Sequence, residues 1–341
     1  MRWIVAGAST IAAEYMIPAF RAQAGSQTGG EAGGDVRCVV SASVERGRDY
    51  AARHGIPHAD TDLATALADP ETDAVYISTT NEKHRDQALA AIAAGKHVLC
   101  EKPIAMTVAD AAGMVLAARK AGVTFATNHH LRCSASHRAI RALVASGRIG
   151  RVLSMRIFHA VHLPPHLQGW RIDNPAAGGG VIPDITVHDA DTVRFLLGEE
   201  PVSVVGAMSA SGMGQGVEDS AMSVWQMASG AMVQSHESFT HPFAGSGLEI
   251  HGSEGSIFAT GVMTQKPLGR VELVTARGRE DIPFAATDLY TTGVAEFIAA
   301  TKGAGRPAAT GEDGVKSLAI ALAVREAAAS GQRQTIHYPD L

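Results

Sequence analysis

The chain has 341 residues, 46% of them hydrophobic and 18% charged, which is typical of a folded two-domain protein and excludes a disordered one. Its net charge is −5 and it has no basic block, so the composition does not indicate a nucleic-acid partner or an anionic membrane surface. Three widely spaced cysteines predict reduced thiols and a cytoplasmic protein. The N-terminal apolar run is too short for a signal peptide, and the sequence has no run of about 18 apolar residues that would predict a membrane span.

The first twenty residues predict a short strand, a turn of small residues and a helix that begins near Ser9 and Thr10. Gly7 stands at the tight turn of a dinucleotide-binding loop, but Ser9 replaces its second glycine and Ala12 its third. The Ser9 hydroxyl could hydrogen-bond a phosphate at the start of the helix. An ordinary strand–turn–helix without a ligand remains open on this motif alone. The glycine-rich segment 25–35 predicts a solvent-exposed loop without chemistry.

Strands and helices then alternate through the first third of the chain. Strands are expected at 35–43, 73–80, 96–100 and 123–130, with helices at 48–55, 84–95 and 108–122. This alternation predicts βαβ units, one parallel sheet and right-handed crossovers. The polar residues at the strand ends, which are Ser41, Thr79 to Asn81, Glu101, Lys102, Asn128 and His129, should therefore converge on the sheet edge where Ser9 lies.

One strand end differs from an ordinary turn. The expected strand His97–Cys100 continues directly into Glu101, Lys102 and Pro103. Pro103 fixes its own φ and favours an extended backbone at Lys102. A lysine held there lies where open α/β sheets bind their ligands. A solvated Glu–Lys pair in a surface loop is the alternative, and the upstream βαβ pattern favours the ligand-facing lysine.

The end of the second strand bears on the choice of coenzyme. An acidic residue usually binds the ribose 2′-hydroxyl of NAD there, but this chain has Ser41, Ala42 and Ser43, with Arg46 one helical turn later. A hydroxyl and a guanidinium, with no carboxylate beside them, suit a 2′-phosphate and predict NADP(H). The alternative is that Arg46 is an ordinary exposed helix residue.

From about residue 127 the pattern changes. Alternating strands separated by glycine turns are expected at 151–163, 222–239, 248–260 and 269–278, with helices at 134–147, 187–198, 293–303 and 312–331. The expected class is therefore α/β, with a doubly wound parallel sheet in residues 1–126 and an α+β substrate domain in 127–341 built on a large, mostly antiparallel open sheet. The helix at about 312–331 would cover that sheet or pack back on the first domain. Whether the chain is a monomer or a homo-oligomer through the second sheet stays open.

The strongest chemical candidates in the second part lie in residues 169–198. Three glycines, 178–180, predict a flexible or closely approached backbone, and Pro183 suits the first turn of a helix. Asp184 and His188 are four residues apart and should share one helical face, which Asp191 would continue. A carboxylate beside an imidazole can fix its tautomer and raise its basicity, as proton transfer requires. An exposed ion pair on a solvated helix is the alternative.

Histidines cluster at His129, His130, His159, His162 and His166. In an alternating strand His159 and His162 point to opposite faces, and the sequence contains neither a CxxC nor an HExxH motif. We therefore expect no metal site, and interpret these histidines as contacts to substrate hydroxyls or as surface residues.

The segments GASTIA, STTNEKH, AGKHVLCEKP and GGGVIPDITVHDAD resemble the Gfo/Idh/MocA oxidoreductases, over essentially the whole chain. The resemblance implies an N-terminal Rossmann domain, a keto-sugar substrate and NADP(H). The further segments TNHHLR, FHAVHLPPHLQGWR, MTQKP and TGEDGV imply NADPH-dependent reduction of the 2-keto group of 1,5-anhydro-D-fructose to 1,5-anhydro-D-mannitol. The alternatives are another sugar or cyclitol dehydrogenase of the family, or a non-catalytic NADP-binding sensor.

The resemblance also implies site residues by motif. The pyrophosphate loop would be Gly7, Ala8, Ser9, Thr10 and Ile11, and the 2′-phosphate site Ser41, Ala42 and Arg46. The rest of the cofactor cleft would comprise Thr79, Thr80, Asn81, Glu82, His84, Glu101, Lys102, Asn128, Trp170, Arg171 and Tyr290. Lys102, Asp184 and His188 would meet the substrate, and which of Lys102 and His188 is the formal proton donor stays open.

Overall fold

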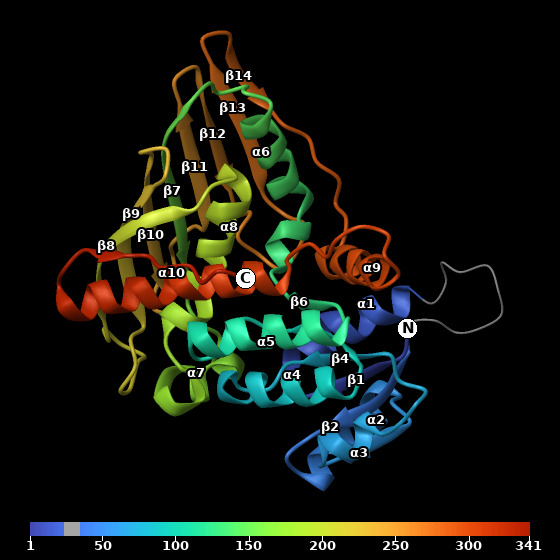
Figure 1. Ribbon diagram of the computed structural model, residues 1–341. Helices are drawn as coiled ribbons and strands as arrows, with labels where there is room; N and C mark the ends of the chain where they lie inside the picture. Colours follow the sequence, from blue (N-terminus) through green and yellow to red (C-terminus); the bar gives the residue numbers. More distant parts are fainter. Residues whose placement is uncertain (24–34) are drawn as a thin grey trace. The chain divides into compact units, whose positions relative to one another are not determined.

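A computed structural model describes residues 1–23 and 35–341 (Figure 1). The glycine-rich loop expected at 25–35 therefore lies, apart from its last residue, outside the described residues. The chain forms two compact units, Met1–His130 with Tyr290–Val315 and Leu341, and Leu131–Leu289 with Lys316–Asp340. The first unit thus includes residues 290–315, which the sequence analysis assigns to the second domain.

The first unit is built on a six-stranded sheet in the order β3-β2-β1-β4-β5-β6, and all neighbouring strands are parallel. Its strands are β1 (Trp3–Ala6), β2 (Val36–Val40), β3 (His58–Asp60), β4 (Ala74–Ile77), β5 (His97–Cys100) and β6 (Phe125–Thr127). The strand order reverses between β1 and β4, and this switch point is where open parallel sheets bind ligands. The predicted doubly wound sheet is confirmed. The short β3 was not predicted, because its three residues show no hydrophobic alternation.

Capping residues set where several helices of the first unit begin and end. Side chains of Ser43, Asp62 and Thr107 accept backbone N–H groups at helix starts, and Gly55 and Gly122 end helices in the left-handed conformation. The helical segments are η1 (Ala12–Met16), α1 (Ile17–Ala22), α2 (Val44–His54), α3 (Leu63–Leu67), η3 (Asn81–Lys83), α4 (His84–Ala93), α5 (Val108–Ala121) and α9 (Leu289–Thr301), with η4 (His130–Cys133) at the unit boundary.

Helix α9 belongs to the first unit because it packs on that unit's aromatic core. The Trp3 ring stacks on Phe20 at 4.1 Å between centroids and lies 5.4 Å from the Phe297 ring of α9. All three side chains are fully buried. A chain segment distant in sequence therefore returns to the sheet through apolar burial.

The second unit contains a nine-stranded sheet in the order β14-β13-β12-β11-β7-β10-β9-β8-β15. Its strands are β7 (Val152–Ala160), β8 (Pro201–Ser209), β9 (Ser220–Met227), β10 (Met232–Ser238), β11 (Gly247–Gly252), β12 (Gly255–Thr260), β13 (Arg270–Thr275), β14 (Gly278–Asp281) and β15 (Gln334–Thr335). Strands β7 and β10 pair in parallel, whereas the other neighbours pair antiparallel. This confirms the predicted large, mostly antiparallel sheet.

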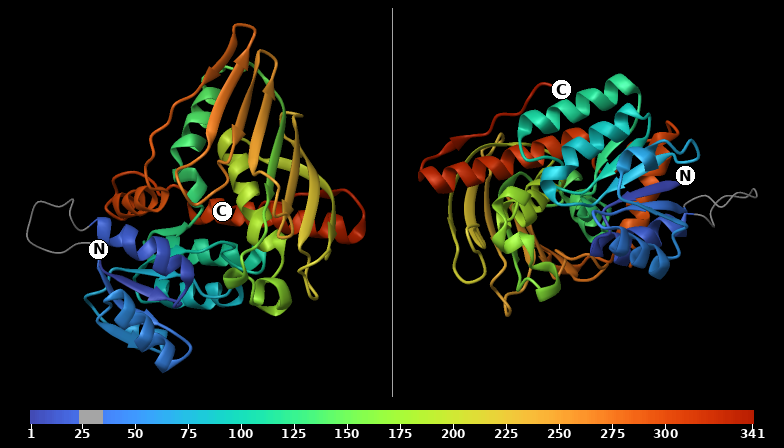
Figure 2. Two further views of the ribbon diagram at one scale, coloured as in Figure 1. Left: turned by 180° about the vertical axis from the view of Figure 1, so that it is seen from behind. Right: turned by 90° about the horizontal axis from the view of Figure 1, so that it is seen from below.

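Helices cover one face of this sheet. Figure 1 shows α6 and α8 in front of the strands, and the view from behind in Figure 2 shows the strands in front of these helices. The helical segments are α6 (Ala135–Ala145), η5 (Pro165–Leu167), α7 (Trp170–Asp173), η6 (Pro175–Ala177), η7 (Ile182–Thr186) and α8 (Val187–Leu197), while α10 (Gly311–Ser330) begins in the first unit and continues in the second. In the part of the chain that the structure describes, no helix is long and apolar enough to cross a membrane.

Candidate functional site

The turn after β1 permits only glycine at its centre. Gly7 has φ +112°, and a Cβ there would lie 2.9 Å from backbone atoms of Ser78. The next helix is held at its start by Ser9, whose Oγ accepts the Ala12 N–H at 3.2 Å and donates to Ser78 Oγ at 2.8 Å. Ser9 therefore caps the helix and joins the ends of β1 and β4, which bound the switch point.

This cap leaves a helix N-terminus at the carboxyl edge of the sheet. The first N–H groups of a helix, here those of Thr10 and Ile11, have no acceptor within the helix. Together with the positive end of the helix dipole they form a favourable site for an anion. The segment from Gly7 to Ile11 thus has the chemistry that a pyrophosphate requires.

Helix α2 is tied to the same loop by two side chains. The Arg46 guanidinium donates from Nη2 to the carbonyl of Ala8 at 2.7 Å, and the buried Tyr50 hydroxyl donates to the carbonyl of Ser9 at 2.9 Å. Ser41 directly follows β2 and is only 6% exposed, whereas Arg46 is exposed. The guanidinium of this exposed residue is therefore fixed beside the loop Gly7 to Ile11. Nothing in the sequence pattern pointed to Tyr50.

The end of β5 is fixed by two neighbouring strands. Tyr76 Oη and Asn128 Nδ2 both donate to Glu101 Oε1, each at 2.6 Å. Burial raises the pKa of Glu101 above its usual value, against the effect of these two donors. The predicted strand-end residues Glu101 and Asn128 thus come together, and they hold the backbone just before Lys102. The contribution of Tyr76 was missed, because it looks like an ordinary core aromatic residue in the sequence.

His84 has a different position from the one expected of a cofactor contact. Its side chain is fully buried, with Nδ1 2.8 Å from the carbonyl of Pro103 and Nε2 3.1 Å from the carbonyl of Thr79. The ring joins the loop after β4 to the segment that follows Lys102. Its contacts are therefore to the backbone that presents the other predicted residues Thr79, Thr80, Asn81 and Glu82.

Tyr290, the last predicted cofactor residue of the first unit, comes from α9. Its ring lies 4.7 Å from that of Tyr15 in η1 and stacks on His130 at 5.2 Å. Tyr290 is 2% exposed. These contacts place α9 beside the helix that follows the phosphate loop.

In the second unit, Asp184 and His188 differ from most residues of their helix because they are partly exposed. Residues 181–197 form one helix whose first part, η7, is a π-helical turn, and within it only Asp184, His188 and the last residue, Leu197, are not buried. An exposed ion pair on a solvated helix is therefore wrong. Asp191, which the spacing places on the same stripe, is buried and receives hydrogen bonds from Arg132 at 2.8 and 2.7 Å.

The helix start is packed tightly against the preceding segment. Arg171 Nε lies 3.5 Å from Asp184 Oδ1, and its guanidinium lies over the Trp170 ring at 4.7 Å. A Cβ at Gly179 would lie 2.6 Å from the carbonyl oxygen of Trp170. Gly179 thus serves close backbone approach, which brings the predicted residues Trp170 and Arg171 beside Asp184.

Glu218 was not predicted, and it supports the same helix. Its Oε1 accepts the N–H of Ile182 at 3.2 Å, and its backbone carbonyl accepts the N–H of Val181 at 3.0 Å. A Cβ at Gly180 would lie 2.4 Å from this carboxylate. A negative charge at a helix N-terminus is stabilising, so Glu218 fixes the start of the helix that carries Asp184 and His188.

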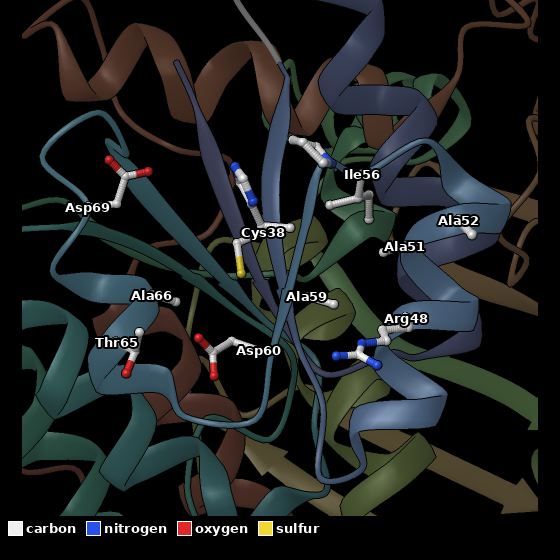
Figure 3. A pocket seen from close by; sticks show the side chains of 12 residues that line it. Cys38, Arg48, Ala51, Ala52, Ile56, Ala59, Asp60, Thr65, Ala66 and Asp69 are labelled. Atoms are coloured by element: carbon white, nitrogen blue, oxygen red, sulfur yellow. The ribbon is translucent and has the colours of Figure 1, made fainter.

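Three further observations concern the described residues. Figure 3 shows an open cavity of about 660 Å³ beside β3, lined by residues such as Cys38, Arg48 and Asp60, and none of the predicted site residues is among its lining. Residues 1–23 and 35–341 also contain no group of three or more His, Cys, Asp or Glu arranged to hold a metal ion. His159, interpreted as a substrate contact or a surface residue, bonds the buried Asp189 through Nδ1 at 3.0 Å.

The strand order, the glycine turn and the helix N-terminus at the switch point define the first unit as a dinucleotide-binding Rossmann domain. The chain belongs to the Gfo/Idh/MocA oxidoreductases. Residues 1–129 match the family described as "Oxidoreductase family, NAD-binding Rossmann fold", and residues 137–258 match its "GFO/IDH/MocA C-terminal domain". The protein is therefore an oxidoreductase with an NAD(P)-binding domain.

Among its relatives, 1,5-anhydro-D-fructose reductase of Ensifer adhaerens is 54% identical over 336 residues, which cover 98% of each chain. Inositol 2-dehydrogenase of Rhizobium meliloti is 30% identical over 316 residues, 89% of this chain and 92% of that protein. The solved structure of levoglucosan dehydrogenase in complex with NADH and levoglucosan superposes with a TM-score of 0.86 at 22% identity, covering 98% of this chain and 99% of that one. That structural likeness concerns the fold alone.

Proposed function

We propose that this oxidoreductase uses NADPH to reduce the 2-keto group of 1,5-anhydro-D-fructose, with 1,5-anhydro-D-mannitol as the product. The observation that carries the proposal is the 54% identity, over nearly the whole of both chains, with the reductase of that substrate. The motif residues Lys102, Asp184 and His188 are all present, which favours an enzyme over a non-catalytic sensor of the same fold.

Bound NADPH supplies the hydride. Hydride addition to the carbonyl carbon leaves negative charge on the oxygen, which requires a nearby cation and a proton. We assign charge stabilisation to the Lys102 ammonium, which the Tyr76–Glu101–Asn128 hydrogen bonds and the following proline hold at the end of β5. The proton comes from His188 or Lys102, and Asp184 orients the site from the same helix as His188.

The coenzyme preference is argued from the end of β2. Position 41 is a buried serine, so no carboxylate side chain stands there to repel a phosphate. Arg46, fixed by its bond to the carbonyl of Ala8, provides an exposed guanidinium beside the loop. Guanidinium groups bind phosphate in charge-assisted hydrogen bonds. These features favour the 2′-phosphate of NADP(H) over the free hydroxyl of NAD(H).

The direct test is to follow coenzyme oxidation with the purified protein and 1,5-anhydro-D-fructose, and to identify the product by NMR. Myo-inositol with NADP⁺ and levoglucosan with NAD⁺ serve as comparison substrates. We expect turnover with the anhydro-ketose, formation of the mannitol epimer and much weaker oxidation of the comparison substrates. Preferred oxidation of a cyclitol would instead identify a dehydrogenase, and tight NADPH binding without any turnover would identify a sensor.

We also propose an assembly and a cellular location for this protein. Val205, Met222, Val224 and Met232 are exposed on β8, β9 and β10, and the strand register places them on the same face of the sheet, opposite to the buried Ala221 and Glu237. This apolar surface favours a homo-oligomer through the second sheet, which light scattering in solution tests. The three buried, unbridged cysteines favour a reducing compartment, the cytoplasm.

A further inference from the structure

Beneath the helix that carries His188, the second unit buries two carboxyl groups that the proposed chemistry does not use. Asp189 of α8 and Glu237 of β10 are both 0% exposed. Glu237 is paired in parallel register with His159 of β7, so these two side chains are neighbours on the sheet face that the helices cover. Asp189 lies over both of them.

The hydrogen bonds at this cluster require a proton. Asp189 Oδ1 is 3.0 Å from His159 Nδ1, and Ser235 donates from Oγ to Glu237 Oε1. The second oxygen of each carboxyl group, Asp189 Oδ2 and Glu237 Oε2, is buried and has no hydrogen-bond partner among the described residues. Two carboxylates can only accept, so these two adjacent groups can bond each other only when one of them is protonated.

We propose that Asp189 and Glu237 share one proton in the folded protein at neutral pH, and that this acid pair positions the first turn of α8, with His188, on β7 and β10. The positioning part rests on the proposed function, because it assigns His188 to the reaction. The shared proton itself depends only on the buried cluster.

The electrostatic surroundings are consistent with this assignment. Burial and the adjacent Asp189 carboxyl raise the pKa of Glu237 well above its usual value. The titratable groups that face the pair from the other packed elements are His159 on β7 and, beside it, His137 on α6. Burial and the neighbouring His159 lower the pKa of His137 to about 4, so His137 is neutral at pH 7. Glu237 therefore holds the proton, and Asp189 remains the carboxylate that His159 binds.

The shared proton has a definite consequence for stability. A group whose pKa is raised on folding stabilises the protein fully below its unfolded pKa, and this contribution is lost as the pH rises through the folded pKa. Above pH of about 4.3, the folded protein therefore holds one proton more than the unfolded chain. Between that pH and the raised folded-state pKa of Glu237, the unfolding equilibrium constant of the wild type should rise by up to about tenfold per pH unit, relative to a variant without the titrating carboxyl.

The experiment compares Glu237→Gln, whose amide donates to Asp189 without needing a proton, with Glu249→Gln. Glu249 points to the opposite face of the sheet, where it pairs with Arg156, and is the matched control. We expect the infrared band of a protonated carboxylic acid in the wild type and the control at pH 7, and its loss in Glu237→Gln. In urea unfolding between pH 5 and 8, the free energy of unfolding of Glu237→Gln should decrease less with rising pH than that of the wild type or of Glu249→Gln.

The positioning role has its own kinetic test. Glu237→Leu, which neither donates nor accepts, should lower kcat about tenfold or more with little change in the KM for NADPH, and Glu237→Gln should restore most of it. An unchanged infrared band in Glu237→Gln, or parallel pH dependence of unfolding, would overturn the shared proton. An unchanged kcat in Glu237→Leu would overturn the positioning role. If the wild type does not turn over the substrate but still shows the infrared band that Glu237→Gln lacks, the proposed function is contradicted and the acid pair is established.

Discussion

Replacement of Arg46 by alanine should change the coenzyme preference of this protein. The wild-type guanidinium donates one hydrogen bond to a neutral acceptor, the carbonyl of Ala8 at 2.7 Å, and in our proposal makes one interaction with the charged 2′-phosphate. Loss of the bond to Ala8 affects both coenzymes equally, whereas the interaction with the phosphate is worth about 1.5–3 kcal/mol and exists only with NADPH. Because Arg46 is exposed, we expect the lower end of the charged range.

Since about 1.4 kcal/mol corresponds to a tenfold change, Arg46→Ala should reduce the preference for NADPH over NADH about tenfold. The assay measures kcat and KM for both coenzymes at saturating keto-sugar. Tyr50→Phe is the matched control, because it removes a bond to the same loop, Tyr50 to the carbonyl of Ser9, without changing charge. It should raise both KM values equally.

The converse change is Ser41→Asp. A carboxylate there should repel the 2′-phosphate and accept hydrogen bonds from the free hydroxyl of NADH, so the KM for NADPH rises and that for NADH falls. Equal losses for both coenzymes in Arg46→Ala and Ser41→Asp would refute the reasoning and show that these residues only support the fold. A wild type that prefers NADH would refute it directly.

Three other outcomes are expected. Lys102→Met should lower kcat about 100- to 1,000-fold with unchanged circular dichroism, because it removes a preorganised charge; a kcat near that of the wild type would exclude the role. His188→Ala and the double variant with Asp184→Ala should have similar rates, since parts of one unit are not additive, and additive losses would indicate separate contacts. Burial alone would raise the pKa of Asp219, but the backbone N–H groups of residues 211–214 outweigh it and hold that pKa well below its usual value. Asp219→Asn should therefore destabilise the protein by about 2 kcal/mol at pH 7. In urea titrations that difference should shrink as the pH falls below about 4, where the wild type loses the contribution; a pH-independent difference would contradict it.

The sequence by itself determined the features that depend on local chemistry. Alternation of apolar strands with helices of about a dozen residues predicted the parallel sheet, and strand-like alternation after residue 150 predicted the second sheet. Gly7 could be predicted because the turn needs a positive φ and a close backbone approach, which only glycine allows, and the structure shows both. The motifs around Lys102 and between Asp184 and Asp191 identified the family, and with it the expected site residues.

Only the tertiary structure decided which polar side chains are buried and what they bind. The i, i+4 spacing placed Asp184 and His188 on one helical face, but it could not show that this helix is otherwise buried. The same spacing placed Asp191 on this stripe, but it could not show that Arg132, 59 residues away, pairs with it in the interior.

The residues that sequence reasoning missed share this property. Tyr50, Tyr76 and Glu218 act through partners 25 to 41 residues distant, and the bond of Asp189 to His159 spans 30 residues. Hydrophobic periodicity indicates which side of an element is buried, but it contains no information about the partner that a buried polar group will meet. That partner is set by strand register and helix packing, which form only when distant parts of the chain come together.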